Sequence, residues 1–81
     1  MNEELLKEEK NMRRLRIIVH ITEAVLMQSN LTLEESFALM ENTKKTALNL
    51  FPDKESVYDL IYTPRFLRII NESFAIPSIK N

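Results

Sequence analysis

The chain has 81 residues, with no glycine, no cysteine, a single histidine and a net charge of −1. The missing glycines and cysteines exclude a P-loop, a glycine-rich dinucleotide-binding turn, a disulfide framework and a cysteine zinc site. The near-neutral charge argues against general polyanion binding, which a basic excess favours. Since Leu, Ile, Val and Phe greatly exceed the roughly 20% typical of disordered chains, we expect one small folded domain.

The N-terminal sequence and the apolar runs bear on location. Met1-Asn2-Glu3-Glu4 is acidic, whereas a signal peptide begins basic and then turns apolar. The longest uninterrupted apolar run covers the four residues 24–27, far fewer than the ~20 needed to cross a bilayer. We therefore expect a cytoplasmic protein with no membrane contact.

A long first helix is predicted over about residues 2–29, where no helix breaker occurs. Apolar residues recur there at steps of three and four, which is typical of an amphipathic helix. The central positions of this stripe are Leu5, Met12, Leu15, Val19 and Leu26.

The length of this helix predicts self-association. About 27 residues at 1.5 Å each reach about 40 Å, whereas a compact domain of this size is roughly 30 Å across. The helix should therefore extend past its own domain or lie against a second copy, and we expect a homodimer. The alternative is a monomer whose charged first turns fray. The pattern leaves open whether the stripe is intersubunit or intramolecular.

The second helix is predicted over residues 32–51. Thr32 and Glu35 form a capping-box pattern, with Thr32 as N-cap and Glu35 at position N3. Pro52 ends the helix, because the residue before a proline avoids the α region. Lys44 interrupts the apolar face and is expected to extend its charged end to solvent.

Two short helices are predicted over about 54–62 and 64–74, with Asp53 and Thr63 as N-caps and Pro64 at the first helical position. One kinked helix from 54 to 74 is the alternative. The expected fold is thus an all-α bundle of three to four helices in a single domain over 1–74. Residues 75–81 are expected to be a flexible tail.

Two arginine pairs are candidates for an anion-binding or partner-binding surface. Arg13 and Arg16 lie in the first helix, Arg65 and Arg68 lie in the last, and the segments around them share five of six residues. The plain alternative is chance repetition of common helix formers. If the repetition is meaningful, the two pairs could form one surface for anions.

Three aromatic residues suggest either a groove or a structural staple. Tyr58, Tyr62 and Phe66 recur every four residues across the junction of the two short helices. They could line a groove for a ligand or partner, since aromatic residues are enriched at interfaces. They could equally hold the two short helices together.

Catalytic and metal chemistry is not expected. His20 is the only imidazole, and we expect it to be half-buried in a helix interface rather than a metal ligand. No serine lies in a strand-to-helix elbow, and the adjacent Glu pairs point apart on a helix. We therefore expect no enzyme activity, no cofactor and no metal.

The function expected from these patterns is a non-catalytic protein-protein interaction module that acts as a homodimer. The alternative is a small DNA-associated transcriptional regulator that uses the arginines of the first and fourth helices, although the net charge makes nucleic-acid binding the weaker expectation. An accessory subunit of a larger complex is the third possibility.

Overall fold

The computed structural model describes residues 2–28 and 30–74, and within these ranges the chain forms helices and no strands. The helices are α1 (Glu3–Gln28), α2 (Leu33–Leu50), α3 (Glu55–Ile61) and α4 (Thr63–Phe74). The predicted all-α bundle is confirmed, and the first two helices begin and end within one residue of their expected bounds. The predicted flexible tail, 75–81, lies outside the described residues.

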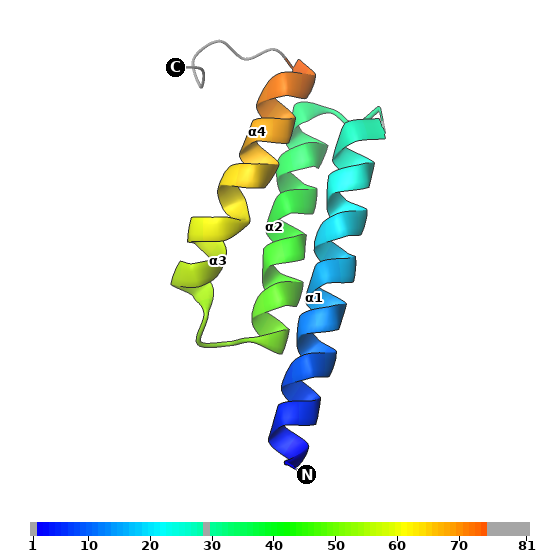
Figure 1. The fold of residues 1–81 in the computed structure, drawn as a ribbon. Helices are drawn as coiled ribbons and strands as arrows, with labels where there is room; N and C mark the ends of the chain where they lie inside the picture. The colour runs from blue at the N-terminus through cyan, green and yellow to red at the C-terminus, as the bar shows by residue number, and fades with distance from the viewer. Residues whose placement is uncertain (1, 29, 75–81) are drawn as a thin grey trace.

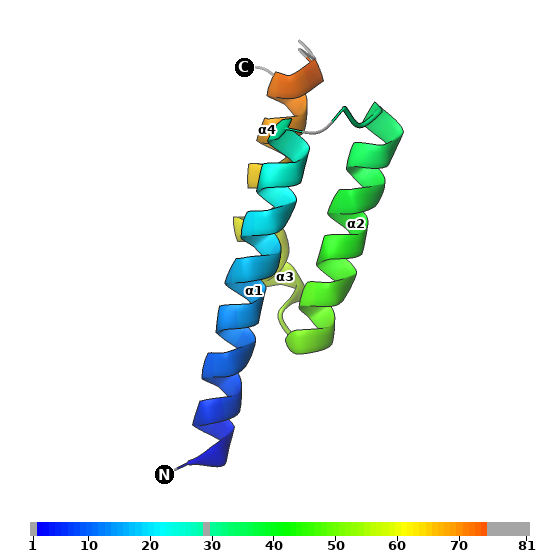
Figure 2. The ribbon, with the colours of Figure 1, turned by 90° about the vertical axis from the view of Figure 1, so that its right-hand side faces the viewer.

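The helices form an elongated bundle in which the chain runs up, down and up again (Figure 1). α4 packs against both α1 and α2, and α1 and α2 also pack against each other. The molecule measures 50 × 24 × 16 Å, and α1 projects well beyond the end of α2 (Figures 1 and 2). Among the described residues, no helix is both long enough and apolar enough to cross a membrane.

The core lies between the α1 stripe and the inner faces of α2, α3 and α4. Leu15, Val19 and Leu26 are buried there within one chain, which answers the question that the pattern left open for these three positions. Met12 is only partly buried, and Leu5 is 59% exposed. The other buried apolar residues are Ala47, Tyr58, Phe66 and Ile70.

A polar contact also lies inside the bundle. The hydroxyl oxygens of Thr22 in α1 and Thr43 in α2 are 2.8 Å apart, and both side chains are buried. Thr43 Oγ1 donates to the carbonyl oxygen of Leu39 at 2.9 Å. Because a hydroxyl has one proton, Thr22 is the donor between the two threonines.

α2 begins as the sequence predicts. The Thr32 side chain accepts from the Glu35 backbone N–H at 3.0 Å, and the Glu35 carboxylate accepts from the Thr32 backbone N–H at 2.9 Å. This reciprocal capping box satisfies two donors at the helix start.

The predicted N-caps of the short helices are wrong. Lys54, not Asp53, occupies the N-cap of α3, with no side-chain cap bond. Thr63 is already helical, and its hydroxyl donates to Asp59 Oδ1 at 2.9 Å instead of capping α4. Local sequence indicates both caps, but Asp53 lies in the turn before Lys54, and the helical hydrogen bonds continue through Tyr62 to Thr63.

α3 and α4 are two pieces of one kinked helix, as the alternative for residues 54–74 had it. The only residue between them, Tyr62, has helical backbone angles, φ −96° and ψ −38°. Its N–H donates to the Tyr58 carbonyl at 2.8 Å, and its own carbonyl accepts from Phe66 at 3.1 Å. Pro64 has no N–H to continue the ladder, which accounts for the kink at this point.

Lys44 ties α2 to α3 from the side of the bundle. Its Nζ lies 3.0 Å from Glu55 Oε2 and 3.0 Å from Asp59 Oδ1. The Asp59 hydrogen bond is the main reason that the pKa of Lys44 is raised, with a second contribution from Glu55. The Lys44 and Thr63 hydrogen bonds lower the pKa of Asp59.

Candidate protein-interaction groove

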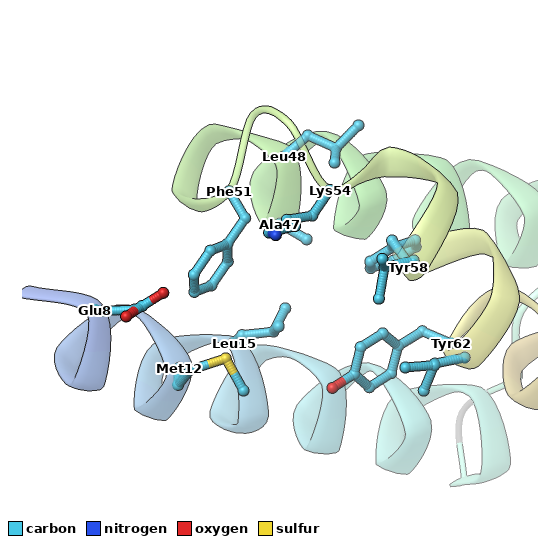
Figure 3. A pocket seen from close by; sticks show the side chains of 11 residues that line it. Glu8, Met12, Leu15, Ala47, Leu48, Phe51, Lys54, Tyr58 and Tyr62 are labelled. Carbon is cyan, nitrogen blue, oxygen red and sulfur yellow. The ribbon is translucent and has the colours of Figure 1, made fainter. Parts of the chain in front are cut away.

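An apolar groove opens between α1 on one side and α2 and α3 on the other (Figure 3). It encloses about 270 Å³, and its charged lining residues are Glu8 and Lys54. The apolar and aromatic lining, which we call the groove face, comprises Met12, Leu15, Ala47, Leu48, Phe51, Val57, Tyr58, Ile61 and Tyr62.

The groove exists because α1 extends beyond the end of α2. Asn11 Nδ2 donates to the carbonyl oxygen of Leu50, the last residue of α2, at 3.4 Å. N-terminal to this bond, residues 3–10 of α1 are all exposed, and we call them the overhang. After Pro52 the chain turns into α3, which leaves the groove open where the overhang leaves the bundle.

Exposed apolar side chains surround the groove. Val57 and Ile61 of α3 are each 46% exposed. Leu5, on the overhang, lies about one turn before Glu8 and belongs to the same stripe as Met12. Apolar surface of this kind, gathered in one place, is typical of an interaction site.

The predicted aromatic trio divides between groove and core. Tyr58 and Tyr62 line the groove, with ring centroids 5.3 Å apart and an angle of 43° between the planes. Phe66 is completely buried and belongs to the core. Two rings therefore face the groove, and the Tyr58–Tyr62 contact spans the end of α3.

Tyr58 lies at the base of the groove with a buried hydroxyl. The hydroxyl has no hydrogen-bond partner among the residues that the structure describes. Burial is the main cause that raises the pKa of Tyr58 to about 12. The phenol therefore stays neutral at physiological pH.

The four candidate arginines are not assembled into one surface. Arg16 and Arg65 line a hollow together with His20, Glu23 and Tyr62. A neighbouring hollow contains Arg13 and Arg16 beside two glutamates. Arg68 is exposed, and neither hollow includes it.

Arg65 is engaged within the chain. Its Nη2 lies 2.7 Å from Glu23 Oε2, and its guanidinium carbon is 5.6 Å from the centre of the Tyr62 ring. Glu23 thus neutralises much of the charge that the arginine pattern offered to an anion. The sequence shows no acid within four residues of Arg65, and nothing local indicates a partner 42 residues away.

The expectation for His20 is wrong. The imidazole is exposed at the edge of this hollow and does not lie in a helix interface, because the core side of α1 is taken by Val19 and Thr22 instead. Within residues 2–28 and 30–74, no three His, Asp or Glu side chains are grouped to hold a metal ion.

A second exposed apolar pair lies on the outer side of α1. Ile17 and Ile21 are 53% and 56% exposed, although the apolar second half of this helix predicts packing on more than one side. They are one turn apart and point away from the core residues Leu15 and Val19. This pair is a second apolar surface, distinct from the groove, that α1 offers to a partner.

Comparisons with known proteins place this arrangement in no family: no protein-family model, no curated protein and no solved structure matches the chain.

Proposed function

We propose that the protein is a non-catalytic, cofactor-free interaction module that acts as a homodimer in the cytoplasm. The observation that carries the proposal is the course of the α1 stripe. It packs into the chain's own core from Leu15 onward and continues past the end of α2 to the exposed Leu5, beside an open apolar groove. A second copy would remove both Leu5 and the groove face from water.

Two properties of the chain support self-association. Domains of this size have small cores and commonly gain stability by oligomerising. The overhang, moreover, has no neighbouring helix on which to pack among the described residues, and most helical stability in proteins comes from such tertiary packing.

The oligomeric state tests the proposal directly. Light scattering behind size exclusion, repeated over a wide range of protein concentration, should give the mass of a dimer. A monomer at every concentration would overturn the proposal.

A substitution at Leu5 locates the surface. Leu5→Glu should weaken the dimer without unfolding the chain, because the side chain is exposed in the monomer. Met27→Glu is the matched control: Met27 is 62% exposed but lies near the other end of α1. Val19 is unsuitable for this purpose, because it is 4% exposed and a glutamate there would disrupt the core.

DNA-associated regulation is the second candidate function, and the shared hollow of Arg16 and Arg65 is the observation in its favour. The Glu23–Arg65 ion pair weakens it, because a neutralised arginine contributes little to phosphate binding. An electrophoretic mobility assay at low salt separates the two functions. Retardation that Arg16→Ala abolishes would favour the regulator, and an unretarded duplex would remove it.

A further inference from the structure

The first half of α1 has segregated charges. Residues 3–9 contain four glutamates and one lysine, whereas residues 10–16 contain one lysine, three arginines and no acid. All of these charged side chains are exposed. The overhang therefore leads with an acidic segment, and a basic segment follows at the point where α1 enters the bundle.

We propose that two copies pair antiparallel through these halves of α1, so that Leu5 of each copy packs at the groove of the other. This inference rests on the homodimer proposed above and names its surface. An antiparallel pair sets the acidic segment of each copy against the basic segment of the other. Opposite charges across an interface determine the register and exclude wrong pairings.

The register of the apolar residues agrees with that of the charges. The antiparallel alignment that sets Leu5 opposite Met12 of the second copy also brings the acidic residues 3–4 of each copy to the level of the basic residues 13–14 of the other. Met12 lines the groove, so the same alignment brings Leu5 to the groove face. Every contact occurs twice, as a two-fold interface requires.

Like charges meet only near the centre of this alignment. Glu8 lies opposite Glu9 of the second copy, and Lys54 lines the same groove as Glu8 and offsets its charge. Lys7 and Lys10 also correspond in sequence, but helical periodicity places them on the side of α1 away from Leu5. A parallel pair would instead oppose acid to acid and base to base along the whole segment.

Charge reversal tests this arrangement. Arg13→Glu/Arg14→Glu and Glu3→Lys/Glu4→Lys should each raise the dissociation constant of the homodimer about tenfold, since each replaces attraction between the acidic and basic segments with repulsion. An equimolar mixture of the two variants should form a heterodimer of near wild-type affinity, because opposite charges again face each other. Lys45→Glu, on the exposed side of α2, is the control and should leave the affinity unchanged.

Cysteine cross-linking tests the direction of the helices, and the natural chain has no cysteine to interfere. A mixture of Leu5→Cys and Met12→Cys chains should oxidise mainly to mixed disulfides. Circular dichroism of each variant verifies that the helices are intact.

The outcomes separate the two proposals. A dimer that withstands both charge reversals, or one whose Leu5→Cys chains link mainly to each other, overturns the antiparallel pairing and leaves the homodimer standing. If the dimer also withstands Leu5→Glu, Ile21→Glu tests whether the outer pair Ile17 and Ile21 forms the interface instead. A wild-type chain that is monomeric throughout overturns both.

Discussion

The hydroxyl of Thr43 accepts a hydrogen bond from Thr22 and donates one to the Leu39 carbonyl. Replacing Thr43 should therefore cost more stability than replacing Thr22. Thr43→Val leaves the Thr22 hydroxyl buried without its acceptor, which should lower the free energy of unfolding by about 1–3 kcal/mol. Thr22→Val should cost less, because Thr43 keeps its bond to the Leu39 carbonyl.

Urea denaturation of both single variants and the double variant measures this difference. The double variant Thr22→Val/Thr43→Val should be more stable than Thr43→Val alone, since no hydroxyl is then left unpaired. Equal losses in the two single variants would contradict the assigned direction of the hydrogen bond.

Removing the Tyr58 hydroxyl should stabilise the protein, in contrast to the threonine substitutions. It is buried without a partner among the described residues, and an unpaired buried polar group is costly. Tyr58→Phe should therefore raise the free energy of unfolding by about 1 kcal/mol. Thermal unfolding at neutral pH measures this change in stability, and a destabilised variant would show that the hydroxyl has a hydrogen-bond partner.

The sequence predicts which face these aromatic side chains share, but not what surrounds each of them. The spacing of Tyr58, Tyr62 and Phe66 indicates a shared face, and the structure places all three on the inner side of α3 and α4. The spacing does not say which ring meets the open end of the groove. That depends on where α2 stops, which is a tertiary property.

At the level of helices, the Lys44 contacts between α2 and α3 should make stability depend on pH. The lowered pKa of Asp59 means that its contribution is present above the ordinary value of 3.8 and is lost as the pH falls through the lower, folded value. The raised pKa of Lys44 means that its contribution is present below 10.5 and is lost as the pH rises through the higher, folded value.

Asp59→Asn isolates this effect. The variant should be less stable than the wild type at neutral pH, and the difference should shrink as the pH falls below the ordinary Asp value of 3.8. Melting temperatures at several pH values measure the difference, and Glu34→Gln, which is remote from Lys44, is a suitable control. A difference that stays constant with pH would contradict the role given to the ion pair.

The helices were predictable to different degrees. α1 and α2 follow from long apolar periodicity, and the start of α2 also follows from a capping box made entirely by neighbours in sequence. The α3–α4 segment was harder, because Thr63-Pro64 is typical both of a helix start and of a kink. The bond from Thr63 to Asp59, four residues earlier, belongs to a continuing helix.

At the scale of the whole molecule, the sequence predicts that α1 is longer than the rest of the domain. It does not predict which end of α1 projects beyond the bundle. Leu5 and Leu26 occupy equivalent positions in one stripe, yet one is exposed and the other is buried. The difference depends on which part of α1 the rest of the chain covers. The Glu23–Arg65 pair likewise needs α4 to lie beside α1.

The antiparallel pairing predicts the shape of the dimer. The two bodies would extend in opposite directions from the paired overhangs, so the longest dimension of the particle should clearly exceed the 50 Å of one chain. Small-angle X-ray scattering measures this dimension. A compact, nearly spherical dimer would contradict the pairing.

The up-down-up course of the chain has a practical consequence for such a particle. It brings the end of α4 to the pole of the bundle opposite the overhang (Figure 1). In an antiparallel pair, the two α4 ends would face outward at opposite poles, with both bodies between them. The protein would then act as a rigid spacer, whose length is determined by how far two copies of α1 overlap.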